Sequence, residues 1–109
     1  MEPALIYAAS GRLKNRVNWA KVSPDTEWIY FGAENDVKEE IAFQEISQYF
    51  HGLPVMIAID RTNSATIKAD DVQRFLNRIL GFKDFHIWDQ SFRRIMEFSR
   101  IGVLRKGII

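Results

Sequence analysis

The chain has 109 residues, of which 47% are apolar, 27% charged and 13% aromatic. This composition excludes a disordered tail or a low-complexity linker, and the length suits a single domain, residues 1–109, with a core that needs no disulfides. The formal net charge of +1 excludes the general basic surface that histone-like proteins present to nucleic acid.

The near-zero net charge is a sum of three opposed blocks. Residues 1–21 hold four basic side chains against one acidic, a net of +3, and residues 73–109 hold eight against three, a net of +5. Between them, residues 22–72 hold three basic side chains against ten acidic, a net of −7. The total therefore does not argue against a charged partner, and the acidic middle favours one that is basic.

Residue types also limit the chemistry and the compartment. The chain has no cysteine, which excludes thiolate catalysis and cysteine-ligated metals, and its two histidines, His51 and His86, are too few for a multi-histidine metal site. The longest apolar run, residues 53–59, is far shorter than the roughly 20 residues of a membrane span. Because the start, Met1–Ala4, does not resemble a secretory signal, we expect a cytoplasmic protein.

The N-terminal third predicts strands. The run Leu5–Ala9 is short, apolar and closed by Ser10–Gly11, which is typical of a buried first strand. Val17–Trp19 alternates apolar and polar residues, and Trp28–Phe31 is rich in β-forming residues, with turn residues between the two runs. We expect these runs to pair as a hairpin, with a short helix over residues 12–20 as the alternative.

The middle of the chain predicts an acidic amphipathic helix. Asp36 and Glu39 have the spacing of a capping box, and the apolar residues that follow recur at helical spacing until Gly52. A helix of about 14 residues is therefore expected to begin near Asp36. Its first turn and outer face are rich in carboxylates, with only Lys38 as a counter-charge; they are Glu34, Asp36, Glu39, Glu40 and Glu45.

The second half predicts further strands and a second helix. Val55–Ile59 is a continuous apolar run, typical of a central strand covered on both faces, and Ala69–Leu80 has helical spacing. Phe85–Trp88 and Val103–Lys106 fit strands, whereas residues 90–100 fit a helix or a strand. These elements predict an α+β or compact α/β domain, with one mixed sheet of about four to six strands and at least two helices packed on it.

The loop after the central strand is the nearest match to a metal site. The spacing of Asp60, Thr62 and Ser64 resembles the Mg²⁺-binding motif of integrin-type adhesion domains. The same residue types favour turns and helix caps, and one carboxylate supplies few of the oxygens that a hard cation needs. We therefore expect a turn here, with a metal-assisted enzyme centred on Asp60 as the weaker hypothesis.

No other pattern points to an enzyme. The common hydrolase, dinucleotide-binding, phosphate-loop and metalloprotease signatures are missing. Asp70 and Asp71 lie at the expected start of the second helix and His51 near the end of the first, where the helix dipole favours each charge. We expect no catalytic residue, no metal and no cofactor.

The C-terminal third mixes basic and aromatic side chains, as nucleic-acid-binding modules do. Phosphate contact and base stacking would use arginines beside exposed rings. Alternatively, the rings fill the core and the cations keep a terminal strand soluble. The residues concerned are Arg93, Arg94, Arg100, Arg105 and Lys106, with Trp88, Phe92 and Phe98. A small RNA- or DNA-binding module is our second hypothesis.

Three stretches cover much of the second half: Ile57–Asp60 leading into a helix, Phe85–Phe92, and Phe98–Gly107. Their sequences resemble bacterial immunity proteins, in particular those of contact-dependent growth inhibition systems. The resemblance implies a role. Such proteins bind the C-terminal toxin domain of an effector delivered by sibling cells, often a nuclease, and protect the producing cell by covering the toxin's active site or substrate surface.

The resemblance and the acidic block together predict an immunity protein whose acidic face covers a basic toxin domain. Clustered like charges repel one another, and a basic partner converts that repulsion into fast, specific association. Trp19 and Trp28 are candidate apolar anchors if they are exposed, and core residues if they are not. The carboxylates expected to bind the partner are Glu34, Asp36, Glu39, Glu40, Glu45, Asp60, Asp70 and Asp71.

Overall fold

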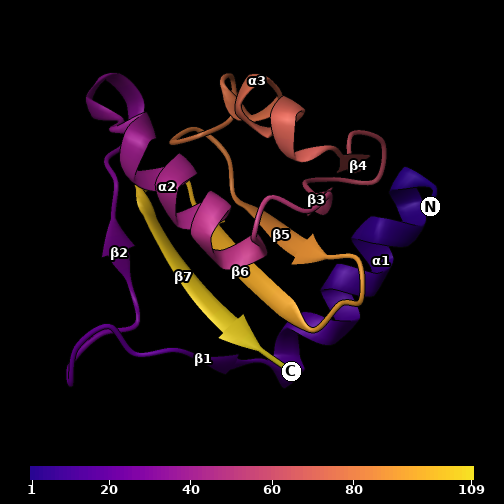
Figure 1. Cartoon of the computed structure of the whole chain (residues 1–109), viewed down its shortest axis with the longest axis horizontal. Coiled ribbons are helices and arrows are strands. Elements are labelled where there is room, and N and C mark those ends of the chain that lie inside the picture. Colours follow the sequence, from indigo (N-terminus) through magenta and orange to yellow (C-terminus); the bar gives the residue numbers. More distant parts are fainter.

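An antiparallel sheet of seven strands runs through the molecule, with helices on both faces (Figure 1). The computed structural model describes all residues from 1 to 109. The helices are α1 (Pro3–Leu13), α2 (Glu39–Phe50) and α3 (Val72–Leu76). The strands are β1 (Asn18–Trp19), β2 (Ile29–Tyr30), β3 (Val55–Ala58), β4 (Ala65–Ile67), β5 (Phe85–Asp89), β6 (Arg94–Ser99) and β7 (Val103–Ile108). Short 3-10 turns are η1 (Lys14–Arg16), η2 (Glu34–Asp36) and η3 (Ala69–Asp71).

The strand order is β1-β7-β6-β5-β3-β4, and β2 also pairs with β7. The predicted α+β class, with helices packed on one sheet, is confirmed. The sheet has seven strands against the expected four to six, because the two-residue strands β1 and β2 both join its edge. The sheet is antiparallel throughout, so the expectation of a mixed sheet was wrong. The reason lies in the short connections from β5 to β6 and from β6 to β7, because parallel neighbours need a long crossover.

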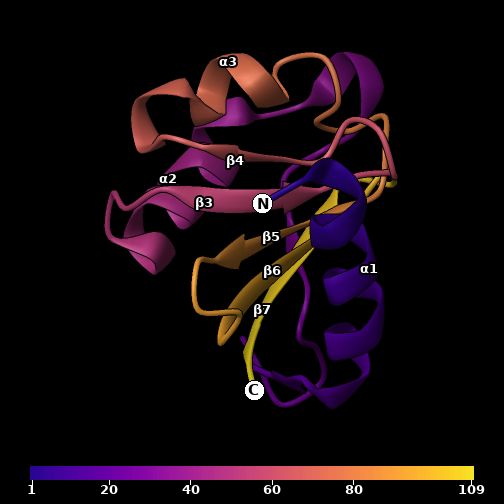
Figure 2. The ribbon, with the colours of Figure 1, turned by 90° about the vertical axis from the view of Figure 1, so that its right-hand side faces the viewer.

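Alternating side chains of the sheet fill two separate cores. Val55 and Ile57 of β3 join the larger core beneath α2 and α3, whereas Met56 and Ala58 join a smaller core beneath α1. Figure 2 shows α1 on one side of the strands and α2 on the other. The prediction of a central strand covered on both faces is therefore confirmed for β3, all four residues of which are buried.

The first element is a helix, so the predicted strand over Leu5–Ala9 was wrong. Pro3 occupies the first turn of α1, where its fixed φ suits a helix and its missing N–H costs nothing. The buried residues of α1 are Ile6 and Ser10, four positions apart, and Trp88 of β5 donates its indole N–H to the Ser10 hydroxyl at 2.9 Å. The face of α1 that carries Ile6 and Ser10 thus lies against the sheet, and Leu5 is exposed.

The predicted hairpin between β1 and β2 was also wrong. Both strands pair with the same edge of β7, with Trp19 opposite Gly107 and Ile29 opposite Leu104. Because β7 has six residues and each partner only two, one edge accommodates both. The turn signal between them is present as a local bridge from Ser23 to Thr26.

The remaining boundaries differ by a few residues. Helix α2 begins at Glu39, because Asp36 belongs to η2 and makes no cap, so the predicted capping box is absent. Its end is as predicted: His51 follows in the left-handed conformation. Helix α3 ends at Leu76, short of the predicted Leu80, and the ambiguous residues 90–100 contain strand β6.

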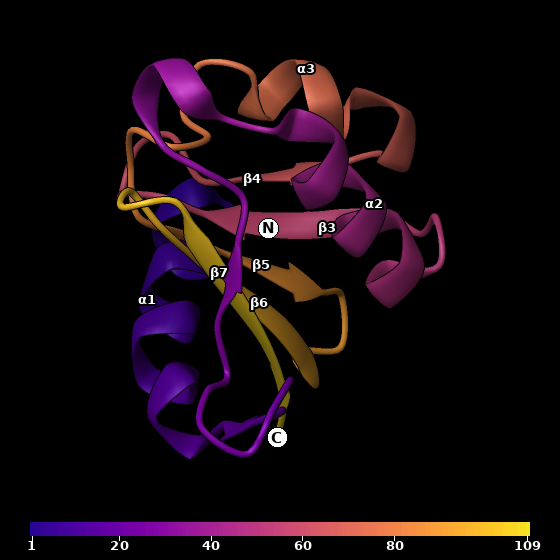
Figure 3. The same ribbon diagram turned by 90° about the vertical axis from the view of Figure 1, so that its left-hand side faces the viewer.

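Three loops come together at one end of the molecule (Figure 3). Each contains a glycine with positive φ, and these are Gly32, Gly81 and Gly102. A Cβ on Gly81 would lie 2.5 Å from the Val37 side chain, and one on Gly102 would lie 2.5 Å from the carbonyl carbon of Gly32. The N–H groups of Phe31 and Gly32 both donate to the carbonyl oxygen of Gly102, at 2.8 and 3.1 Å. The loop before α2, the loop after α3 and the β6–β7 turn therefore contact one another directly.

We expect Gly102→Ala to lower the free energy of unfolding by about 2–4 kcal/mol, because the new methyl group would overlap Gly32 at a φ of +95°. The matched control is Gly11→Ala within α1, where no atom lies within 4 Å of the new Cβ. There the change should stabilise by about 0.5–1 kcal/mol through helix propensity. Urea denaturation measures both, and equal effects would contradict the close packing described for the loops.

Candidate interaction surface

Four exposed carboxylates gather at the start of α2. Glu34 and Asp36 belong to η2, and Glu39 and Glu40 form the first turn of the helix. None of the four takes part in an ion pair. The positive end of the helix dipole stabilises Glu39 and Glu40. The repulsion among the four carboxylates remains, and only solvent or a partner can reduce it. We call Glu34, Asp36, Glu39 and Glu40 the acidic cluster.

The structure does not bring Glu45, Asp70 or Asp71 to this surface. Glu45 is 18% exposed and binds the Lys106 ammonium of β7 at 3.0 Å, so it serves the fold. Asp70 and Asp71 lie in η3, and Asp71 pairs with Arg74. Their neighbour Ala69 lines a hollow together with residues at the far end of α2, and a helix of this length separates its ends by about 17 Å.

Asp60 organises the turn after β3. One of its oxygens accepts hydrogen bonds from the backbone N–H groups of Thr62 and Asn63, at 2.9 and 2.7 Å, and the Asn63 amide donates to both oxygens. These bonds, led by the Asn63 side chain, lower the pKa of Asp60 to about 2. Ser64 completes the turn by donating to the Asp60 carbonyl oxygen. The predicted turn is confirmed, and no group of three His, Asp or Glu side chains has the geometry to hold a metal ion.

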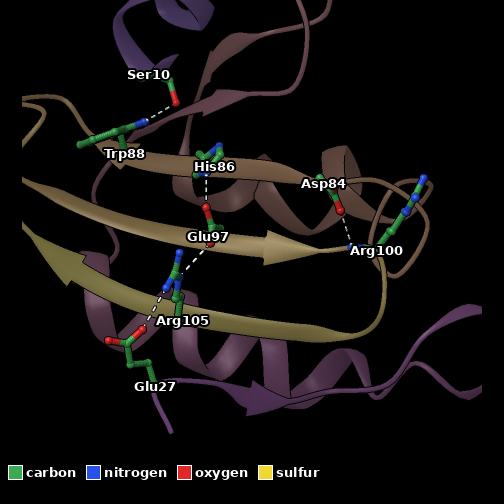
Figure 4. A network of polar contacts seen from close by, with 8 residues as sticks. All are labelled: Ser10, Glu27, Asp84, His86, Trp88, Glu97, Arg100 and Arg105. Carbon is green, nitrogen blue, oxygen red and sulfur yellow. Dashed lines mark hydrogen bonds and ion pairs between the residues drawn. The ribbon is translucent and has the colours of Figure 1, made fainter. Parts of the chain in front are cut away.

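A row of charged side chains crosses three adjacent strands on the face that α1 partly covers (Figure 4). His86 of β5 contacts Glu97 of β6 at 2.8 Å, and Arg105 of β7 donates to Glu97 at 2.8 Å and to Glu27 at 2.9 Å. The register explains the row, because His86 is opposite Glu97 and Glu97 is opposite Arg105. Sequence reasoning missed this row, since its members are far apart in the sequence and only the register of β5, β6 and β7 aligns them.

Glu97 is the centre of the charged row. Burial alone would raise its pKa, but the hydrogen bond and charge of His86, together with those of Arg105, hold the pKa below its usual value. The charged form of Glu97 therefore stabilises the folded state.

Trp19 and Trp28 flank the guanidinium of Arg105. Its central carbon lies 3.9 Å from the ring centre of Trp19 and 4.5 Å from that of Trp28. Both indoles are half-buried, and Trp19 packs against the smaller core. Their contacts are thus internal, and of the two alternatives for these residues the structure favours internal packing over a role as exposed anchors.

The basic residues of the C-terminal third are mostly engaged within the fold. Arg105 and Lys106 are ion-paired, and Arg94 donates to the Tyr49 carbonyl oxygen at 3.0 Å. Trp88 and Phe98 are fully buried. Arg93 and Arg100 lie beyond opposite ends of β6, so these residues do not form one basic, aromatic surface.

Two open hollows lie away from the acidic cluster. One, of about 190 Å³, lies between α2 and α3 and is lined mainly by apolar side chains, among them Phe43, Phe50 and Leu53. The other, of about 320 Å³, lies between α1 and the ends of β3 and β5, and includes Lys14 and His86. The Nε2 atom of His86 is held by Glu97, which gives this histidine a structural partner.

Comparison with models of protein families, with curated proteins and with solved structures found no match for this chain. None of its helices has the length and apolar character needed to cross a membrane.

We expect Glu97→Gln to reduce the free energy of unfolding by about 1–3 kcal/mol at pH 7, because it removes the charge that His86 and Arg105 share. A lowered pKa contributes stability that is present above the ordinary glutamate value of about 4.3 and is lost as the pH falls through the folded value. The difference from wild type should therefore shrink by pH 3.

Chemical denaturation at pH 7 and pH 3 measures this difference. The matched control is Glu39→Gln, an exposed residue without an ion pair, which should change stability by less than about 0.5 kcal/mol at either pH. An equal loss for Glu97→Gln at both pH values would contradict the assignment of a stabilising charge to Glu97.

Proposed function

We propose that this chain is an immunity protein that binds and neutralises a bacterial toxin domain, and that the acidic cluster covers a basic surface of that toxin. A nuclease, which must grip phosphate groups with cations, is the toxin class that fits best. The chain itself performs no catalysis in this role. The sequence resemblance described above supports the class of protein, and the charges of the folded surface support the manner of binding.

The observation that carries the proposal is the contrast between paired and unpaired carboxylates. The ion pairs of the protein use Glu27, Glu45, Asp71 and Glu97, whereas the acidic cluster is exposed and unpaired. Four carboxylates within seven residues, with Lys38 as the only counter-charge among them, raise the energy of the isolated protein and are stabilised by a cationic partner. Such a surface accelerates encounter with that partner and discriminates against anionic ones.

The mechanism is occlusion. Carboxylates on a helix and its preceding turn would occupy the cationic groove where the toxin holds nucleic acid, and the bulk of the domain would prevent the substrate from entering. Charges at the rim of an interface mainly set the association rate and the specificity, so tight binding also needs apolar contacts at its centre.

The alternative, a small RNA- or DNA-binding module, has less support from the geometry. Its expected aromatic residues Trp88 and Phe98 are buried, and Arg105 and Lys106 are neutralised by carboxylates. Only Arg93 and Arg100 of the expected cations extend freely from the ends of β6. If the alternative holds, replacing these two by alanine weakens oligonucleotide binding and reduces its salt dependence.

The test of the proposed function is protection. The proposal predicts that a secreted effector is encoded immediately upstream. The chain is co-expressed with the C-terminal domain of that effector, and we expect restored growth and a stable complex on co-purification. A toxin domain that kills despite the chain, with no complex formed, would refute the proposal.

We expect the quadruple variant Glu34→Gln, Asp36→Asn, Glu39→Gln, Glu40→Gln to weaken toxin binding by about 10–100-fold at low salt, chiefly through slower association. Surface plasmon resonance at two salt concentrations measures this change. The control neutralises three exposed, unpaired carboxylates outside the cluster, in the variant Glu2→Gln, Asp25→Asn, Asp70→Asn. It should retain binding within about threefold, because these carboxylates do not belong to the acidic cluster. Equal losses in both variants would show that net charge alone, not the acidic cluster, attracts the partner.

A further inference from the structure

Two large apolar side chains are exposed where the three glycine-containing loops meet. Phe82 is 55% exposed and follows Gly81, while Ile101 is 69% exposed and precedes Gly102. Gly81 packs against Ala33 and Glu34, and Gly102 packs against Gly32 and Ala33. Phe82 and Ile101 therefore stand on two loops that both contact the segment at the start of the acidic cluster.

The backbone beneath these side chains is held firmly. Besides the two hydrogen bonds that the Gly102 carbonyl accepts, the Arg100 N–H donates to the Asp84 carboxylate at 2.7 Å and ties the β6–β7 turn to the loop after α3. Below the turn, Phe98 stacks on Phe85 with ring centres 4.6 Å apart. A backbone held in this way has little further freedom to lose when a partner binds, which lowers the cost of ordering the loops.

We propose that Phe82 and Ile101 are the apolar anchors of a docking surface whose rim is the acidic cluster. Its occupant is a protein domain that surrounds an apolar pocket with cations. This inference rests on the proposed function and specifies where on the chain the toxin domain binds. Charge complementarity selects the occupant, because the acidic cluster repels a polyanion and favours a cationic protein surface.

The rim is not uniformly acidic, and this sharpens the description of the partner. Lys83 and Arg100 lie on the same loops as Phe82 and Ile101 and are exposed. A fitting partner is therefore cationic opposite the start of α2, apolar opposite the two anchors, and not cationic opposite Lys83 and Arg100. A surface with this pattern distinguishes its partner from other basic proteins, because a mismatched cation would face one of its own sign.

The anchors and the rim should affect different rate constants. Truncating an apolar anchor leaves long-range attraction unchanged and removes contacts made only in the complex, so dissociation becomes faster. Neutralising the rim weakens attraction before contact, so association becomes slower and less dependent on salt. A separation of these two effects would not arise if Phe82 and Ile101 were merely solvent-exposed loop residues.

The experiment measures binding to a catalytically inactive form of the upstream toxin domain by surface plasmon resonance. Phe82→Ala and Ile101→Ala should each raise the dissociation rate about tenfold or more and change the association rate less than about twofold. The matched controls are Leu5→Ala on α1 and Leu53→Ala after α2, which are similarly exposed at 55% and 62% and should bind as wild type. Thermal unfolding checks that all four variants are folded.

The outcomes separate the two proposals. If wild type binds and protects but Phe82→Ala and Ile101→Ala bind equally well, the docking surface is wrong while the immunity role stands. If folded wild type does not bind the toxin at all, both are overturned. Sedimentation of the chain alone provides a further check: a dimer that Ile101→Ala dissociates would identify the occupant as a second copy and overturn the assignment to a toxin.

Discussion

Close backbone contact at Gly32, Gly81 and Gly102 determines where this protein can present side chains to a partner. Each glycine has a positive φ and no room for a Cβ, so the three loops lie nearer to one another than side chains would allow. At these contacts the glycines leave no room for a side chain, whereas Phe82 beside Gly81 and Ile101 beside Gly102 are exposed. Exposed apolar groups and unpaired carboxylates are thereby supported by a well-packed base.

Folding decides which charges of the chain are paired internally and which remain free to contact a partner. The acidic block of the sequence separates into carboxylates that bind cations within the fold, such as Glu45, one that shapes a turn, Asp60, and the free acidic cluster. Three of the eight cations in the basic C-terminal block pair with carboxylates, namely Arg74, Arg105 and Lys106. The net charge of the chain is therefore a poor guide to its surface, and the unpaired charges are a better one.

Elements with a clear local pattern could be predicted from the sequence. Elements whose type depends on contacts with residues far along the chain could not. The continuous apolar run Val55–Ile59 located β3, and the patterns of Phe85–Trp88 and Val103–Lys106 located β5 and β7. The run Leu5–Ala9 suits either a strand or a helix. Distant contacts accompany the helix: Ile6 packs in the core that contains Trp88, and the adjoining Ser10 accepts the Trp88 indole N–H across 78 positions. The acidic cluster was predicted from consecutive residues. Phe82 and Ile101 were not, because turn glycines beside them carry no sign that three loops converge.

The sheet divides the interior into two cores, so the two faces of the protein can open independently of each other. Helix α1 rests on a small core of Ile6, Met56, Ala58, Trp88 and Ile95, whereas α2 and the docking surface share the larger core on the opposite face. Opening of the N-terminal helix would expose the small core and leave the larger one closed. Amide protons of α1 should accordingly exchange with solvent before those of β3. Local opening of α1 would then leave a partner bound on the opposite face undisturbed.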